Sequence, residues 1–240
     1  MSIPKVIHYC WFGGNPLPAN LKKYIASWEK YLPEYRIIEW NESNFDVNIN
    51  QFVRQAYDMK KYAFVSDYAR LYALEQYGGI YLDVDIQVLK PLEEELLQNE
   101  AVFCFELNEK VMTAFMAVEK EHPLIKEFLA VYEEKNFDID HMVPNTDLLT
   151  ELLKARGLVL NGEMQMIDQI KIFPSEYFNA YDAKNSVYCI SKDTYMIHHF
   201  YGSWCSPGER FKFQLQKKVR AILGQRLFDS LKKIKKKLIG

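Results

Sequence analysis

The chain has 240 residues, of which 49% are hydrophobic, and its 30 Lys and Arg nearly balance 32 Asp and Glu, leaving a formal net charge of −2. This composition is typical of a globular protein with a full apolar core, and it excludes an intrinsically disordered chain. We expect no signal peptide and no membrane-spanning segment, because no apolar run approaches the ~18 residues that cross a bilayer.

The first part of the chain predicts alternating strands and helices. Residues 6–12 and 35–40 are short apolar runs of strand type, and residues 21–32 repeat apolar side chains at helical spacing. Helical spacing returns over 49–62 and 63–77, where the pair Gly78-Gly79 ends the second helix. Strand–helix–strand units favour a parallel sheet covered by helices, so we predict the α/β class.

Residues 80–89 follow with the alternation of a strand. Tyr81, Asp83 and Asp85 fall on one predicted face, so the two carboxylates lie ~6–7 Å apart along the backbone. Two like charges this close are tolerated beside a cation, and carboxylate oxygens suit Mg²⁺ or Mn²⁺. The alternative is a strand that exposes two ordinary acids to solvent.

The preceding helix carries a polar group next to this strand. Ser66, Asp67 and Arg70 have the three- and four-residue spacing that places side chains on one helix face. They form either a surface ion pair of little energetic value or a polar group aimed at a ligand. The tight turn at Gly78-Gly79 brings helix and acids close together in space.

The remaining chain predicts strands at 101–106, 111–118, 170–173, 187–190 and 195–200. Helices are expected at 122–135 and 146–155. Asn145 or Thr146 is expected to cap the second of these helices. The alternative is that the polar residues at this helix start face a bound sugar.

The last thirty residues differ from the rest in charge. Residues 211–240 hold ten Lys and Arg and a single acid, Asp229, giving +9 against −11 for the preceding residues. Their apolar residues recur at helical spacing, which predicts a basic amphipathic helix suited to an anionic membrane. A helix packed on its own domain is the alternative, while the lack of interleaved aromatic residues disfavours nucleic-acid binding. We therefore divide the chain into a domain at 1–208 and a helical tail at 209–240.

Three separated motifs occur in a fixed order along the chain. They are Ile3-Pro4-Lys5-x-Ile7-His8-x-x-Trp11-Phe12-Gly13, then Ser66-Asp67-x-x-Arg70 with Tyr77-Gly78-Gly79-Ile80-Tyr81-Leu82-Asp83-Val84-Asp85, and last His198-x-x-x-x-Ser203-Trp204. In these motifs the chain resembles the DXD-type sugar transferases of glycosyltransferase family 32. It is also similar to the catalytic domains of the large clostridial glucosylating toxins. The resemblance implies a GT-A fold, with a Rossmann-like, mostly parallel sheet flanked by helices.

The resemblance also assigns residues to the binding of a nucleotide-sugar donor. These are Trp11, Ser66, Asp67, Arg70, Tyr81, Asp83, Ser203 and Trp204. Trp11 is implied to stack on the base, while Asp67 and Arg70 hold the donor sugar and phosphate. Asp67, Arg70 and Asp85 are the implied catalytic residues.

A divalent cation, Mn²⁺ or Mg²⁺, is implied as the cofactor. Its implied ligands are Asp83, largely through water, Asp85 directly, and His198. His198 is preferred to His199 because its spacing to Ser203 fits the closing motif.

The function expected from this resemblance is that of a metal-dependent retaining glycosyltransferase. It would move a hexose or N-acetylhexosamine, with a UDP-sugar as the expected donor, to a glycan or lipid-linked glycan in bacterial capsule, surface polysaccharide or lipooligosaccharide synthesis. The basic tail suggests a cytoplasmic enzyme that is peripheral on the inner face of the cytoplasmic membrane. A protein-glycosylating toxin or effector and a metal-dependent nucleotide phosphohydrolase remain as alternatives.

Overall fold

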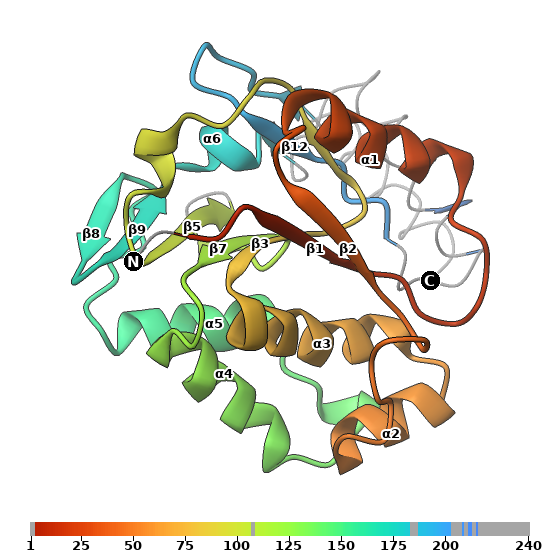
Figure 1. Ribbon diagram of the computed structural model, residues 1–240. Coiled ribbons are helices and arrows are strands. Elements are labelled where there is room, and N and C mark those ends of the chain that lie inside the picture. Colours follow the sequence, from red (N-terminus) through yellow and green to blue (C-terminus); the bar gives the residue numbers. More distant parts are fainter. Residues whose placement is uncertain are drawn as a thin grey trace, which may run out of the picture.

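The computed structural model describes residues 3–106, 109–182, 187–202, 208, 211–212 and 215. The strands of its main sheet are β1 (Val6–Cys10), β2 (Arg36–Trp40), β3 (Gly79–Leu82), β5 (Ala101–Glu106), β6 (Lys110–Val111), β7 (Phe115–Val118), β8 (Gln165–Ile167) and β9 (Ile170–Phe173). They form an eight-stranded sheet in the order β2-β1-β3-β7-β5-β9-β8, with β6 paired to β5 (Figure 1).

Helices cover this sheet on both faces. They are α1 (Ala19–Tyr31), α2 (Gln51–Asp58), α3 (Tyr62–Tyr77), α4 (Pro123–Glu133), α5 (Asn145–Lys154) and α6 (Ser175–Phe178), with short 3-10 turns η1 (Glu94–Leu97) and η2 (Ile139–His141). In Figure 1, α2, α3, α4 and α5 lie below the sheet, and α1 and α6 lie above it. The buried residues accordingly divide into two large clusters on opposite faces. The predicted α/β class is confirmed.

The sheet is mixed, and two of its parallel strand pairs lie in the N-terminal part of the chain. β1 pairs in parallel with β2 and with β3, as the strand–helix–strand pattern predicts. β7 is antiparallel to both β3 and β5, and β9 is parallel to β5. All four residues of β3 are buried, because helices cover the strand from both sides.

The glycine pair between α3 and β3 is a structural requirement. Gly78 and Gly79 have φ angles of 62° and 99°, which residues with side chains rarely adopt. A Cβ on Gly79 would lie 2.5 Å from the carbonyl oxygen of Val6 in the neighbouring strand. His8 reinforces this junction, since its Nε2 lies 2.9 Å from the carbonyl oxygen of Gly78. The pair therefore fixes where the acidic segment begins.

The prediction of one continuous strand over 80–89 is wrong. The chain leaves the main sheet after Leu82 and turns, with the Ile86 N–H donating to the carbonyl of Asp83 at 2.9 Å. The next strand, β4 (Ile86–Val88), pairs instead with β12 (Met196–His198) in a separate antiparallel sheet. The alternation misled because Val84, inside the turn, is also buried. The turn, and not a shared strand face, therefore brings the acids together.

Smaller differences occur in the second half of the chain. The strand expected over 111–118 is divided into β6 and β7 by residues 112–114, and a small hairpin forms from β10 (Tyr181–Asp182) and β11 (Val187–Tyr188). The predicted cap of α5 is also wrong, because Pro144 precedes the helix and Asn145 is its first residue. The side chain of Asn145 is engaged elsewhere.

Among the described residues, no helix has both the length and the apolar character needed to cross a membrane. Apart from four positions, the helical tail predicted at 209–240 and the boundary before it lie outside the described residues.

Candidate active site

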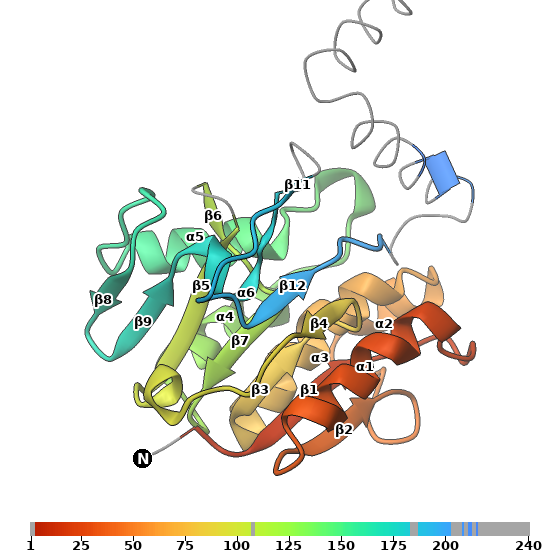
Figure 2. The same cartoon turned by 90° about the horizontal axis from the view of Figure 1, so that it is seen from above.

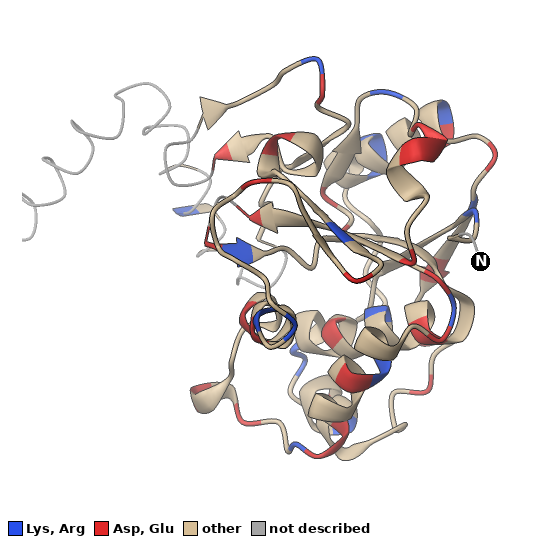
Figure 3. Cartoon of the chain, turned by 90° about the vertical axis from the view of Figure 1, so that its left-hand side faces the viewer, with Lys and Arg blue, Asp and Glu red and all other residues tan. Residues whose placement is uncertain are grey.

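Four separate parts of the chain meet beside the ends of the central strands. They are α3, the turn between β3 and β4, the start of α5, and β12 with the residues that follow it. Figure 2 shows β12 running alongside β4. The acids and bases drawn in Figure 3 are spread over the whole domain, so the site is recognised from its contacts and not from charge alone.

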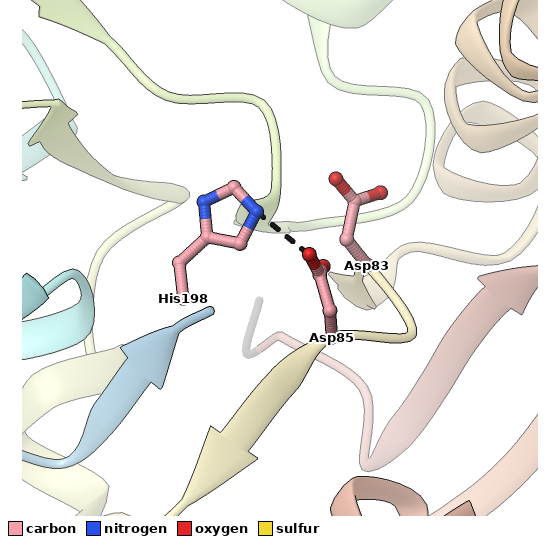
Figure 4. Close-up of side chains that lie close together, drawn as sticks. All are labelled: Asp83, Asp85 and His198. Carbon is pink, nitrogen blue, oxygen red and sulfur yellow. Dashed lines mark ion pairs between the residues drawn. The ribbon is translucent and has the colours of Figure 1, made fainter. Parts of the chain in front are cut away.

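The turn and β12 bring two acids and an imidazole together (Figure 4). Asp83, Asp85 and His198 each offer a ligand atom, and these atoms lie within 4.8 Å of one another. The Nε2 of His198 lies 3.4 Å from Oδ1 of Asp85. The antiparallel pairing of β12 with β4, which sets His198 opposite Ile86, accounts for this approach.

The backbone after β12 holds Asp85 in place. The N–H of Tyr201 donates to Oδ2 of Asp85 at 2.6 Å, and the N–H of His199 donates to its carbonyl oxygen at 3.0 Å. Burial alone would raise the pKa of Asp85, but the charge and hydrogen bond of His198 outweigh it and lower that pKa. The ionised carboxylate is therefore the favoured form in this site.

His198 has one nitrogen without a partner. Its Nδ1 is buried and forms no hydrogen bond, whereas its Nε2 faces Asp85. Two carboxylates and an imidazole are a donor set that fits a divalent cation such as Mn²⁺. The structure therefore contains a possible metal site, and the identity of the metal is a separate question.

The neighbouring His199 points to different partners. Its ring stacks on Tyr24 with the centroids 4.4 Å apart, and its Nε2 lies 2.9 Å from Oε1 of Gln87. Of the two adjacent histidines, His198 is therefore the one beside the acids.

Arg70 connects α3 to the acidic turn. Its guanidinium lies 3.1 Å from Oδ1 of Asp67 and 3.3 Å from Oδ1 of Asp83, and it donates to the carbonyl of Thr113 at 2.9 Å. The side chains of Arg70 and Asp67 are only 7% and 14% exposed. The alternative of a surface ion pair is therefore wrong. Arg70 also lies 4.5 Å from the ring centre of Tyr81, in a cation–π arrangement.

Asp67 is buried strongly enough to change its protonation. Burial raises its pKa to about 7, and this effect exceeds the opposing charge of Arg70. The side-chain amide of Asn145 donates to Oδ1 of Asp67 at 2.5 Å, and Asn145 also accepts a hydrogen bond from Thr113 at 2.9 Å. Asn145 was expected to cap α5, with a position facing a bound sugar as the alternative. Its signal was the polar start of that helix.

The other predicted donor-binding residues have different local settings. The hydroxyl of Tyr81 donates to Oδ1 of Asp83 at 2.9 Å, whereas that of Ser66 donates within its own helix to the Tyr62 carbonyl at 3.0 Å. Trp11 follows β1 and is only partly buried, and its indole N–H donates to a loop carbonyl at 2.7 Å. It also packs against the edge of one hydrophobic cluster. Ser203 and Trp204 lie outside the described residues.

Glu106 was also absent from the predicted set. It ends β5, and its pKa is raised by burial although His198 and Lys110 oppose the shift. No motif marks it, since it stands at the end of an ordinary apolar strand.

The sequence comparisons find glycosyltransferases similar to this chain. Residues 18–103 match the family described as a glycosyltransferase sugar-binding region containing a DXD motif. An uncharacterised glycosyltransferase of Acanthamoeba polyphaga mimivirus is 26% identical over 217 residues, covering 84% of each chain. Inositol phosphoceramide mannosyltransferase 1 of Schizosaccharomyces pombe is 26% identical over 150 residues, which cover 57% of this chain but only 44% of the relative.

Similarity to a solved structure concerns the fold. The PaToxG glycosyltransferase superposes with a TM-score of 0.52 over 64% of this chain and 69% of its own, at 20% identity. The expected resemblance to DXD-type sugar transferases, the GT-A type of α/β fold and the enzyme class are thereby confirmed. The chain carries a DXD sugar-binding region and is a glycosyltransferase.

Proposed function

We propose that the chain is a metal-dependent retaining glycosyltransferase that transfers a hexose or N-acetylhexosamine from a nucleotide sugar to a glycan. The observation that carries this proposal is the convergence of Asp83, Asp85 and His198 within 4.8 Å, directly beside the buried pair Asp67–Arg70. The cluster of two acids and His198 suits the diphosphate of a donor with its cation, and the Asp67–Arg70 pair suits sugar hydroxyls.

The cation of this proposal is Mn²⁺, with Mg²⁺ as the alternative. Asp85 and His198 would hold it directly, and Asp83 would complete the set largely through water. When bound, such a cation neutralises charge on the diphosphate as a Lewis acid. The residues fit this role because the pKa of Asp85 is lowered by His198, whose Nε2 faces its carboxylate.

The protein side chains would position the donor. Arg70 offers a guanidinium that can bridge a phosphate oxygen and a sugar hydroxyl, and Asp67 accepts from two hydroxyls. Tyr81 and Ser66 would lie beside the ribose, and Trp11 would stack on the base. Ser203 and Trp204 are proposed to cover the diphosphate and exclude water from the donor.

Retention at the anomeric carbon follows from attack on one face. The acceptor hydroxyl forms the new bond on the side from which the diphosphate departs, and a leaving phosphate oxygen takes its proton. Arg70 adds positive charge as the glycosidic C–O bond breaks, which lowers the energy of the transition state. The proposal therefore needs no enzyme nucleophile.

A donor panel tests the proposal. The full chain is incubated with Mn²⁺ and each of a set of UDP- and GDP-sugars, and nucleotide release is measured with and without glycan acceptors. GDP-mannose is included because two relatives, from Schizosaccharomyces pombe and Candida albicans, are named mannosyltransferases. We expect one UDP-sugar to be preferred, with release that requires metal and increases with acceptor.

The same panel distinguishes the competing functions. Release of nucleotide without transfer to any acceptor would favour a nucleotide phosphohydrolase, and transfer only to protein would favour a toxin or effector. No metal-dependent release from any nucleotide sugar would overturn the proposal. Product anomers read by NMR report whether the configuration is retained.

We further propose a setting in bacterial surface polysaccharide or lipooligosaccharide synthesis, on the cytoplasmic face of an anionic membrane. The support is the +9 charge of residues 211–240 together with their amphipathic spacing. Flotation with anionic liposomes compares the full chain with a version that ends after Pro207. Equal binding of the two would exclude the tail as the anchor.

A further inference from the structure

Three charged side chains meet where β5 ends and α5 begins. Glu106 pairs in antiparallel register with Lys110, and Nζ of Lys110 lies 2.5 Å from Oδ1 of Asp147 in the first turn of α5. The N–H of Val111 donates to the hydroxyl of Thr150 at 2.9 Å, which holds the β5–β6 hairpin against the helix. The three residues therefore occupy a fixed position.

This group adjoins the sugar end of the proposed donor site. Asn145 stands at the start of the same helix as Asp147, and its amide donates to Asp67 at 2.5 Å. The pair Lys110–Asp147 is partly exposed, with side chains 40% and 35% accessible. The start of α5 therefore connects Asp67, the buried acid of the proposed donor site, to the partly exposed Lys110–Asp147 pair.

Glu106 faces the other side of the site as well. The charges that act on its carboxylate are those of His198, Lys110, Asp147 and Asp83. Among the described residues, this carboxylate has no hydrogen-bond or ion-pair partner, and Lys110, its partner in the strand register, is engaged by Asp147. It is nevertheless only partly exposed. A half-buried carboxylate without a partner has unused capacity to accept hydrogen bonds.

We propose that Glu106, with the Lys110–Asp147 pair at its rim, forms the acceptor subsite and binds hydroxyl groups of an uncharged sugar. The inference rests on the proposed retaining transfer. Same-face attack requires the acceptor hydroxyl beside the departing diphosphate, and the charges of His198 and Asp83, on that side, act on the carboxylate of Glu106. A carboxylate accepts from two hydroxyls at once, whereas its charge, added to those of the nearby acids, repels an acidic sugar.

The experiment measures how the enzyme divides its donor between water and sugar. Full-length protein with Mn²⁺ and its preferred nucleotide sugar is assayed for hydrolysis alone, and for transfer to neutral p-nitrophenyl glycosides and to p-nitrophenyl glucuronide. Glu106→Ala and Glu106→Gln are compared with Glu151→Gln as a control. Glu151 lies on α5, and its carboxylate forms an ion pair with Lys154. The readout is the ratio of transfer to hydrolysis.

We expect this ratio to fall ~10–100-fold in Glu106→Ala, through the acceptor KM, since a hydrogen bond to a charged group is lost. Glu106→Gln should retain an intermediate ratio, and it should narrow the wild-type preference for neutral over acidic acceptors. Glu151→Gln should match the wild type.

An unchanged ratio in Glu106→Ala would overturn the inference, whether both rates persist or both fall together. Hydrolysis by the wild type without transfer to any neutral glycoside would also overturn it. The first result leaves the proposed donor chemistry unaffected, whereas the second would favour a nucleotide phosphohydrolase if acidic sugars and glycans also accept nothing. The donor chemistry itself fails separately if the wild type hydrolyses no nucleotide sugar in the presence of metal.

Discussion

Nε2 of His198 lies 3.4 Å from Oδ1 of Asp85, although the two residues are far apart in the sequence. The contact exists because β12 returns antiparallel to β4, immediately after the acidic turn. It joins β12 to the DXD motif. If the pair holds a cation, each of the two residues is needed for metal affinity.

Asp85→Ala should abolish metal-dependent turnover and weaken Mn²⁺ binding at least ~100-fold, because a charged ligand is removed. Mn²⁺ affinity measured by calorimetry, together with turnover, checks this. Circular dichroism should show an intact fold. Metal-independent activity at the wild-type level in this variant would contradict the assignment of Asp85.

The two adjacent histidines provide a matched comparison. His198→Gln should raise the Kd for Mn²⁺ ~10–100-fold, whereas His199→Gln should change it little, because the ring of His199 contacts Tyr24 and Gln87 instead. Metal titration of both variants at one pH is the measurement. Equal losses would mean that the segment acts through its backbone position and not through the imidazole of His198.

Arg70→Lys keeps the positive charge but loses the planar fork that reaches Asp67 and Asp83. We expect kcat to fall ~100-fold and stability to fall by about 2–4 kcal/mol, since two acids lose part of a mostly buried partner. Steady-state kinetics and urea unfolding report the two effects. A kcat near that of the wild type would leave Arg70 with a structural role alone.

His8 makes stability depend on pH. Burial lowers its pKa to about 4, and Trp40 and Gly78 hold the neutral ring. The unfolded chain binds this proton near pH ~6.5, so its stabilising contribution is full above that pH and declines as the pH falls toward 4. Over this range the free energy of unfolding falls by about 3 kcal/mol. Urea unfolding across this range should show a shallower slope for His8→Gln, while the exposed His141→Gln should retain the wild-type slope.

Gly79→Ala separates backbone strain from close packing. A Cβ there meets the Val6 carbonyl oxygen at 2.5 Å, whereas Gly157, with a similar φ of 103°, has nothing within 4 Å. Gly157→Ala should therefore cost about 1–2 kcal/mol from strain alone, and Gly79→Ala should cost distinctly more. Thermal unfolding compares them. Equal costs would mean that β1 and β3 can separate without penalty.

Much of the fold follows from local patterns. Apolar runs and helical spacing predict β1, α1, β2 and α3 closely, and Gly78-Gly79 predicts where α3 ends. Those signals are local, because burial on one or both faces of an element leaves a period in the sequence. The site residues Asp83, Asp85, Arg70 and His198 are also identifiable from the sequence, because each stands in a motif with a recognisable spacing.

Tertiary structure alone decided how these residues meet. The period of residues 80–89 is the same for a straight strand and for a strand interrupted by a turn, so only the pairing of β4 with β12 revealed the turn. Asn145 and Glu106 carry no motif, and they reach the site because α5 and β5 pack beside it. The sequence by itself determined the class of enzyme and the class of fold. The packing of distant elements determined the geometry, since contacts between residues far apart in the chain leave no local period.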